Sequence, residues 1–252
     1  MNPVHTFILS ATVALSLTVF TSQAHAADCT SIPSHADLTT ALKASTKPSG
    51  GPSNGGLDLN MWASIVNRDG EICAIAMTGA TRGDQWPGSR VISAQKANTA
   101  NAFSLPGLAL STANLFSAVQ PGGSLFGLQF SNPVDPSVAY GKHTNYGTDK
   151  DPMNGKKPGG VNVFGGGLAL YNEAGEIIGA IGVSGDTSCA DHNIAWRTRE
   201  ALGLNHVPGG VHPDGHDGII YDITDDKSAS GFGHPTCGST ENTVAAEIGA
   251  GK

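Results

Sequence analysis

The sequence Ala63-Ser-Ile-Val-Asn-Arg-Asp-Gly-Glu-Ile72 recurs in altered form as Leu168-Ala-Leu-Tyr-Asn-Glu-Ala-Gly-Glu-Ile177. An apolar run follows each copy and ends at Thr78-Gly-Ala-Thr81 in the first and at Ser184-Gly-Asp-Thr187 in the second. Gly70 and Gly175 supply the residue that tolerates a positive φ in a tight turn. We therefore predict two β-hairpins. Their second strands, Ile72–Met77 and Ile177–Val183, are apolar on both parities, which predicts strands covered on both faces.

A helix is predicted after each hairpin. Residues Ser89–Ser104 carry small and apolar side chains at a spacing of three, which is typical of a helix that packs closely on a sheet or on another helix. After the second hairpin, Ser188 and Asp191 have the spacing of a capping box. The second helix is expected to run to about Leu202, where Gly203 ends it.

The remaining elements complete one domain over residues 27–252. Helices are predicted at Ser34–Ala44, capped by Ser34, and at Ser111–Val119, and a strand at Gly218–Ile223. Residues Asn132–Gly160 form a long inserted loop, and the tail from residue 205 to residue 252 is otherwise irregular. The fold class that follows is α/β (α+β), a single domain with a mostly antiparallel sheet flanked by helices.

Composition and the N-terminus indicate an exported protein. The chain has 252 residues, a net charge of −7 and only 14% charged residues, which argues against nucleic acid as a partner. Phe7–Phe20 is an apolar stretch too short to cross a bilayer comfortably, and Ala24-His25-Ala26 has the form of a cleavage site. We predict a signal peptide at residues 1–26, a periplasmic or secreted mature chain and no stable membrane anchor. A buried core helix is the alternative.

Four cysteines fall in the predicted mature chain. An oxidising compartment favours disulfides, and the lack of a C-x-x-C motif argues against a zinc knuckle. Three pairings are possible. We expect Cys189–Cys237, which would tie the tail to the body, together with Cys29–Cys73. The alternative for Cys73, which lies in an apolar run, is a buried free thiol.

The common catalytic signatures are missing from the sequence. There is no G-x-S-x-G elbow, no P-loop and no H-E-x-x-H motif. Five residues of the tail could coordinate a metal ion, namely His206, His212, Asp214, His216 and Asp217. Their loop, rich in Gly and Pro, offers no fixed geometry, so a solvated polar tail is the favoured interpretation and the metal content stays open.

The long loop has the residue types that bind a planar apolar ligand bearing carboxylates. It contains Tyr140, Lys142, His143 and Tyr146, and four of the chain's 14 basic residues fall between Lys142 and Lys157. Aromatic rings would stack on such a ligand while lysines pair with its acids. The alternative is that the loop is charged for solubility alone.

Two further residues are candidates for ligand binding. His192 lies in the first turn of the second helix, where the helix dipole disfavours its protonated form and leaves a neutral nitrogen as a possible axial ligand. An ordinary, partly exposed histidine is the alternative. Lys96, among alanines of the first helix, would reach an acidic partner or a ligand carboxylate, or would extend to the helix edge.

The segment from Trp62 to Leu204 resembles the GlcG/HbpS family, the haem-degrading domain family, which is related to the C-terminal domain of PduO-type proteins. The residues that carry the resemblance are Val66-Asn-Arg-Asp-Gly70, Ala94-Gln-Lys-Ala97 with Asn98-Thr-Ala-Asn-Ala-Phe103, Gly159-Gly-Val-Asn-Val-Phe164, and Gly179-Ala-Ile-Gly-Val-Ser-Gly185 with Asp191. The resemblance implies a sheet of about five antiparallel strands, haem or a related tetrapyrrole as the cofactor, and assembly into a homo-oligomer. Asn162 departs from the G-G-V-P pattern usual in the family.

Three functions follow as hypotheses. The first is an exported haem-binding protein that stores, buffers or senses haem without turnover, with candidate binding residues His192, His143, Tyr140, Lys142 and Lys96. The second is an enzyme that degrades haem oxidatively or acts on a small organic acid; no nucleophile–base pair supports it. The third is a structural assembly partner that packs through the helix at Ser89–Ser104.

Overall fold

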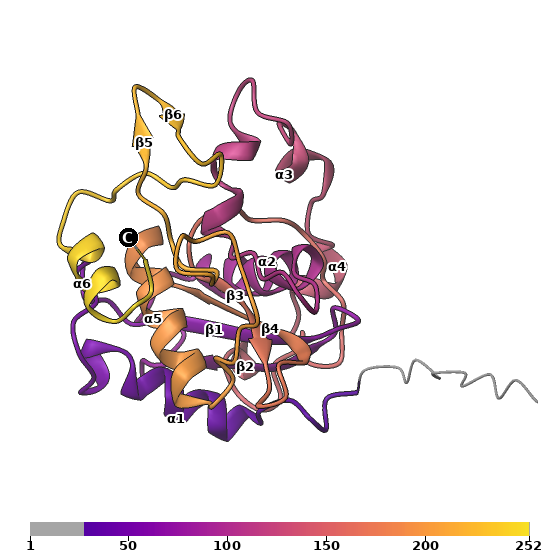
Figure 1. The fold of residues 1–252 in the computed structure, drawn as a ribbon. Helices are drawn as coiled ribbons and strands as arrows, with labels where there is room; N and C mark the ends of the chain where they lie inside the picture. Colours follow the sequence, from indigo (N-terminus) through magenta and orange to yellow (C-terminus); the bar gives the residue numbers. More distant parts are fainter. Residues whose placement is uncertain (1–27, 252) are drawn as a thin grey trace, which may run out of the picture.

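The computed structural model describes residues 28–251, so the predicted signal peptide lies outside the described residues. The helices are α1 His35–Ala44, α2 Ser89–Phe103, α3 Leu128–Ser131, α4 Pro136–Ala139, α5 Ser188–Ala201 and α6 Glu241–Glu247 (Figure 1). Short 3-10 turns are η1 Lys47–Ser49, η2 Ala113–Leu115, η3 Ser117–Val119 and η4 His143–Asn145. The strands are β1 Trp62–Asn67, β2 Ile72–Met77, β3 Gly167–Tyr171, β4 Ile177–Ser184, β5 Ile223–Thr224 and β6 Lys227–Ser228.

The two predicted hairpins form and join into one antiparallel sheet of order β2-β1-β4-β3. Gly70 and Gly175 have φ of 76° and 73°, as the turns require. β1 pairs with β4 along its whole length, from Trp62 opposite Ser184 to Asn67 opposite Gly179. The prediction of an α/β fold with an antiparallel sheet is therefore confirmed, although the main sheet has four strands and not about five.

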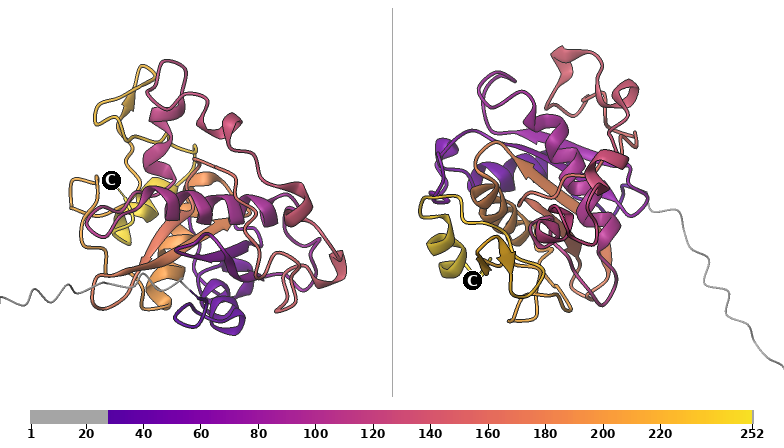
Figure 2. Two further views of the ribbon diagram at one scale, coloured as in Figure 1. Left: turned by 90° about the vertical axis from the view of Figure 1, so that its right-hand side faces the viewer. Right: turned by 90° about the horizontal axis from the view of Figure 1, so that it is seen from above.

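Helices cover both faces of this sheet. Figure 2 (left) shows α2 on one face and α1 on the other, and α5 packs beside α1. Alternate residues of β1 divide between two cores, because side chains alternate along a strand. Trp62 and Val66 pack beneath α2, whereas Ala63 and Ile65 face α1 and α5.

The contact between α2 and β4 depends on Gly182. A Cβ atom at Gly182 would overlap the backbone of α2 at Ser93 and Ala97. The small residues at one-turn intervals on this helix, Ala94, Ala97 and Ala100, are buried completely in the same layer. The sequence pattern of small residues therefore reports helix-on-strand packing at backbone contact.

The helix caps agree with the prediction at one helix and differ at the other. Ser34 caps α1 in a capping box with Asp37, as its position before the helix predicts. At α5 the cap is Thr187, whose side chain accepts a hydrogen bond from Ala190 N, so the predicted capping box of Ser188 and Asp191 is wrong. The Asp191 carboxylate accepts the backbone N–H of Asp186, two residues before the helix, and pairs with a lysine of α2.

Other segments differ from the sequence-based expectation in detail. The predicted helix Ser111–Val119 is two 3-10 turns, η2 and η3. The predicted strand at Gly218–Ile223 is reduced to an isolated bridge between Ile219 and Gly251 and to β5. The long loop Asn132–Gly160 contains α4 and η4. Within residues 28–251, no helix combines the length and apolar character needed to cross a bilayer.

Candidate functional site

An aromatic cleft of about 420 Å³ opens between the start of β1 and the long loop. We call it the aromatic cleft and define it by its lining residues, which are Trp62, Thr81, Arg82, Gly83, Pro87, Tyr140 and Tyr146. Three of these seven residues are aromatic and one is a cation. The volume lies in the range of about 300–1,000 Å³ usual for small-molecule sites.

The inner wall of the aromatic cleft is fixed by Trp62. This residue is the first of β1 and is 1% exposed, and its indole Nε1 donates a hydrogen bond to the Trp86 carbonyl oxygen at 3.1 Å. Buried indole groups usually find such an acceptor. The bond ties the segment that precedes α2 to the edge of the cleft.

The opposite wall is held by a buried ion pair. Arg90 on α2 forms two hydrogen bonds to the Asp151 carboxylate and a third to the Ala139 carbonyl at 2.8 Å. The Arg90 guanidinium also lies 3.8 Å from the centre of the Tyr146 ring. Asp151 in turn accepts hydrogen bonds from the backbone N–H groups of Gly147 and Met153. One side chain of α2 therefore fastens both ends of the segment 139–153.

Three of the residues predicted to bind a ligand lie together on this fastened segment. Tyr140 lines the cleft and is 56% exposed. Lys142 and His143 follow it and are exposed, before the chain returns to the cleft at Tyr146. The Tyr146 hydroxyl lies 3.3 Å from the backbone nitrogen and from the carbonyl oxygen of Gly141, which closes the loop on itself.

Lys96 lies apart from the cleft, in the core. Its ammonium group is 2.6 Å from Asp191 Oδ2 and 3.1 Å from the Val183 carbonyl oxygen, and the side chain is 2% exposed. Burial raises the pKa of Asp191 to about 6, although Lys96 and a hydrogen bond from Asp186 N act in the opposite direction. Of the three roles considered for Lys96, the structure shows the acidic partner.

His192 is also separate from the aromatic cleft. It is completely buried on α5, where burial lowers its pKa to about 3. Its Nε2 atom lies 3.1 Å from the Ala250 carbonyl oxygen, and Nδ1 has no hydrogen-bond partner. A ligand could reach this imidazole only if the C-terminal residues moved away.

The histidine-rich tail is more ordered than a solvated loop. Asp217 is buried and forms a bidentate ion pair with Arg199 at 2.7 and 2.8 Å. Ligand atoms of His212, Asp214 and His216 lie within 4.8 Å of one another. However, both Nδ1 atoms accept backbone N–H groups, and the two imidazole rings are stacked at 4.1 Å and 13°. The in-plane lone pairs of parallel rings do not converge on one ion.

Carboxylates of the chain itself bind the backbone N–H groups in the turn from β4 into α5. Asp191 Oδ1 accepts the backbone N–H of Asp186 at 2.8 Å, and Asp186 Oδ1 accepts that of Thr187 at 2.6 Å. Asp186 also accepts the N–H groups of Leu57 and Leu59. Carboxylates of the chain thus occupy the donors that an external anion would use at this helix start.

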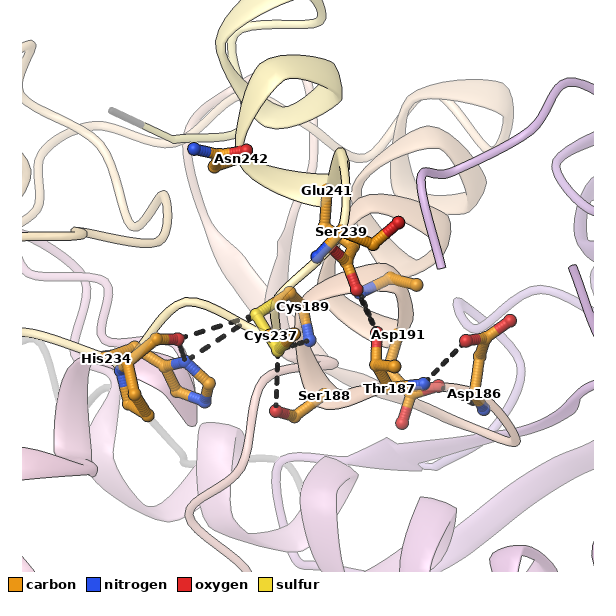
Figure 3. The surroundings of a disulfide bond; sticks show 12 residues. Asp186, Thr187, Ser188, Cys189, Asp191, His234, Cys237, Ser239, Glu241 and Asn242 are labelled. Carbon is orange, nitrogen blue, oxygen red and sulfur yellow. Dashed lines mark hydrogen bonds between the residues drawn. A yellow bond between two sulfur atoms is a disulfide. The ribbon is translucent and has the colours of Figure 1, made fainter. Parts of the chain in front are cut away.

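Both disulfides form with the predicted pairing. Cys29 is joined to Cys73 and Cys189 to Cys237, and no cysteine of the described chain is free. Figure 3 shows Cys237 held against the first turn of α5, beside His234. The alternative of a free thiol at Cys73 is therefore wrong.

Sequence reasoning missed much of the cleft. It identified Tyr140 and Tyr146 from the composition of the loop, but not Trp62, Arg82 or the ion pair of Arg90 with Asp151. Arg90 and Asp151 are 61 positions apart, and no local pattern joins them. Arg90, a single charged residue before the small-residue run of α2, gave a weak signal, whereas Asp151 lies in the charged run Asp149-Lys150-Asp151 and gave none.

Comparison with known proteins gives a family and several structural neighbours, three of which are described below. The family model described as haem degrading protein HbpS-like matches residues 55–200. No curated protein sequence matches the chain. Among solved structures, protein ORFY of Klebsiella pneumoniae is 23% identical over 66% of this chain and 86% of its own, with a TM-score of 0.44. A PduOC–haem complex is 24% identical over 68% and 94%, with a TM-score of 0.47. A double mutant of HbpS from Streptomyces reticuli is 16% identical over 77% and 99%, with a TM-score of 0.41.

Proposed function

The chain belongs to the HbpS-like family of haem-degrading proteins, and we propose that it binds haem in the aromatic cleft, where it stores, buffers or senses haem without degrading it. The observation that carries the proposal is the meeting of Trp62, Tyr140 and Tyr146 around one opening beside Arg82. Aromatic walls desolvate and stack on a planar macrocycle, while a cation at the rim pairs with its carboxylates.

The residues around the cleft fit the donor set that haem needs. His143 is exposed on the loop between the two lining tyrosines, so its imidazole can turn toward a ligand without breaking the core. Imidazole and phenolate are both known as axial ligands of haem iron. In this proposal His143 would offer its imidazole to the iron, Arg82 and Lys142 would pair with the carboxylates of the ligand, and Tyr140 would stack on its ring.

His192 and Lys96 have positions that suit structural roles better than ligand contact. The imidazole of His192 is enclosed by the residues around Ala250, and Lys96 is neutralised by Asp191. Using either side chain for haem would require the core to open. Their part in haem binding, if tested by substitution, is expected to be secondary to that of His143.

Titration with haemin tests the proposal. The disulfide-intact protein is expected to give a saturable Soret shift at one haem per chain and quenching of tryptophan fluorescence, because Trp62 lines the cleft. His143→Ala should remove the Soret shift, and Tyr140→Ala should weaken binding about tenfold through the lost stacking. His206→Ala is the matched control, since His206 is exposed after the end of α5 and does not line the cleft. Absence of a saturable shift, or unchanged spectra in His143→Ala, would refute the assignment.

Turnover of haem is the second candidate, because the family description names haem degradation. The lining residues of the cleft include no carboxylate and no nucleophile–base pair. This argues against acid–base or covalent catalysis on an organic acid in the cleft, whereas oxidative haem cleavage requires no such residues and is decided by the next experiment. Incubation of the haem complex with a reductant and oxygen distinguishes the two: intact haem supports binding alone, whereas a bilin product would establish degradation. Consumption of a small organic acid by the haem-free protein would support the other enzymatic alternative.

Export and self-assembly belong to the same proposal. Two disulfides tie the N-terminal and C-terminal segments to the body, and such bonds persist in oxidising compartments. We place the mature protein in the periplasm or outside the cell, as a homo-oligomer. Cell fractionation tests the first point and mass measurement in solution tests the second; a cytoplasmic monomer would contradict both.

A further inference from the structure

The disulfide between Cys189 and Cys237 lies at the N-terminus of a 14-residue helix. Cys189 is the second residue of α5, and its backbone N–H donates a hydrogen bond to Cys237 Sγ at 3.2 Å. The Ser188 hydroxyl lies 3.5 Å from the same sulfur (Figure 3). Cys189 is completely buried, whereas Cys237 is partly exposed. Cys237 is therefore the more exposed residue of the pair and its sulfur has two donors beside it, whereas Cys189 is enclosed.

The second disulfide lies beside an acidic residue. A carboxylate oxygen of Glu71 lies 3.9 Å from Cys29 Sγ, and the Glu71 carbonyl oxygen lies 3.7 Å from Cys73 Sγ. The donor on this side is Asn67 Nδ2, 4.0 Å from Cys29 Sγ. Neighbouring negative charge disfavours a thiolate, while a helix N-terminus favours it. Because Cys29 and Cys73 are both partly exposed, exposure alone does not separate the two disulfides.

We propose that Cys189–Cys237 is a thiol–disulfide exchange site for dithiol and disulfide reactants, with Cys237 as the exchanging sulfur and Cys189 as the resolving one. The Cys29–Cys73 disulfide has a structural role only. Exchange of this kind depends on the stability of the thiolates and on access to the attacked sulfur. At α5 the greater exposure and the two hydrogen-bond donors both belong to Cys237, and the His234 imidazole lies 3.9 Å from Cys189 Sγ, the sulfur that leaves when Cys237 is attacked.

The exchange with an external dithiol proceeds in two balanced steps. A thiolate of the dithiol attacks Cys237 Sγ, the Cys189–Cys237 bond breaks, and its electron pair leaves on Cys189 Sγ. The second thiolate of the dithiol then attacks the dithiol's other sulfur, which is bonded to Cys237. The mixed disulfide breaks, and its electron pair leaves on Cys237 Sγ. The dithiol is oxidised to a disulfide, the protein is reduced by two electrons, and the two protons of the dithiol pass to solvent or to the cysteines.

The surroundings of Cys189 accommodate its reduced form. His234 is 1% exposed, and its Nδ1 atom lies 2.7 Å from the Pro235 carbonyl oxygen and 3.9 Å from Cys189 Sγ. That carbonyl oxygen is itself 3.5 Å from Cys189 Sγ. An N–H at Nδ1 can donate to a thiolate on Cys189, and the carbonyl can accept from a thiol. His234 is in this sense a positioning residue.

Opening the disulfide leaves the tail attached. The Thr187 hydroxyl donates to Glu241 Oε1 at 2.9 Å, and Asn193 Nδ2 donates to the Glu241 carbonyl oxygen at 2.9 Å. These bonds hold the start of α6 against α5 independently of the sulfurs. The reduced protein is therefore expected to stay folded, which allows the exchange to be measured under native conditions.

Graded reduction with dithiothreitol, followed by alkylation and peptide mass mapping, tests the proposal on the full folded chain. Cys189 and Cys237 should become labelled at least about tenfold faster than Cys29 and Cys73, because a stabilised thiolate leaves faster. In the variant Cys189→Ser, oxidised glutathione should form a mixed disulfide on Cys237. Equal rates for the two pairs, or faster labelling of Cys29 and Cys73, would overturn the proposal.

A pH profile separates thiolate stabilisation from simple access. In Cys189→Ser, the alkylation rate of Cys237 should have its midpoint below the pKa of about 8.5 of an ordinary thiol. Ser188→Ala, which removes one donor, should move that midpoint upward. A midpoint at or above the ordinary value would refute the stabilisation even if the disulfide reduced quickly. Haem binding plays no part in these measurements, so their outcome is independent of the proposed function.

Discussion

Lys96 Nζ on α2 lies 2.6 Å from Asp191 Oδ2 on α5, although the two helices cover opposite faces of the sheet. The lysine reaches past the end of β4, where it also donates to the Val183 carbonyl oxygen. Both side chains are almost completely buried. The three layers of the domain are thus connected by one ion pair at the point where the second hairpin becomes a helix.

Substituting Lys96 by Met should destabilise the protein by about 3 kcal/mol at pH 7, because it leaves a buried carboxylate without its cation. The loss relative to wild type should shrink at pH 5, since protonation of Asp191 removes the uncompensated charge. Urea denaturation at the two pH values measures both effects. Lys47→Met, which breaks the exposed pair with Asp58, is the control and should cost no more than about 1 kcal/mol. Equal losses in the two variants would contradict the prediction.

Gly182→Ala should destabilise the fold by about 3 kcal/mol, because the added methyl group overlaps the α2 backbone and cannot be relieved by a rotamer change. Gly88→Ala is the matched control: the same methyl group at Gly88 meets no atom within 4 Å. Thermal or urea unfolding of both variants checks the difference. If Gly182→Ala were as stable as Gly88→Ala, the backbone contact between α2 and β4 would be wrong.

The buried imidazole of His192 predicts a loss of stability on acidification. Its folded-state pKa is lowered to about 3 from an ordinary value of 6.5, so the unfolded chain binds the proton first. The neutral, buried imidazole contributes fully to the free energy of unfolding above pH 6.5. This contribution is lost as the pH falls from 6.5 toward 3, by up to about 1.4 kcal/mol per pH unit. The free energy of unfolding, measured with urea at pH 7, 6 and 5, should fall less steeply with decreasing pH in His192→Gln than in the wild type. Identical slopes in both proteins would exclude this origin.

Asp151→Asn should loosen the wall of the aromatic cleft. The substitution leaves the Arg90 guanidinium buried without a counter-charge, which costs about 3–5 kcal/mol when one partner of such a pair is removed. Hydrogen exchange should accelerate between residues 139 and 153 more than in β4. Asp149→Asn, at an exposed position of the same segment, is the control and should leave the exchange rates unchanged.

The sequence predicts those parts of the fold that arise from short-range patterns. The two hairpins follow from turn glycines and apolar runs, and α1 follows from Ser34 and Asp37. The prediction for the cap of α5 is wrong because Asp186-Thr-Ser188 offers three adjacent capping side chains, and the sequence does not show which of them accepts the free N–H of the helix.

The candidate site was predictable only on one side. The loop residues Tyr140 and Tyr146 stand out by composition, whereas Trp62 and Arg82 come from other segments and join them through tertiary packing. The geometry that groups them depends on the pair of Arg90 and Asp151. Such a contact between distant charged residues leaves no periodic trace in a single sequence.

The strand order β2-β1-β4-β3 has a consequence for self-association. The edge strand β2 is the second strand of its hairpin, and the other edge strand, β3, is the first strand of its hairpin. The β3 edge of one molecule could therefore pair with the β2 edge of a neighbouring molecule and continue the same strand order. Unprotected edges of this kind would permit open-ended fibre growth.

The chain closes both edges with its own atoms. On β2, Ile72 exchanges hydrogen bonds with Gly155 and Lys156, and His35 contacts the Ile75 carbonyl oxygen; on β3, the bonding groups are Thr112 to Gly167, Arg199 to Ala169 and Leu204 to Tyr171. These segments therefore occupy backbone groups of the edge strands that could otherwise pair with another molecule, which disfavours open-ended assembly through the sheet edges.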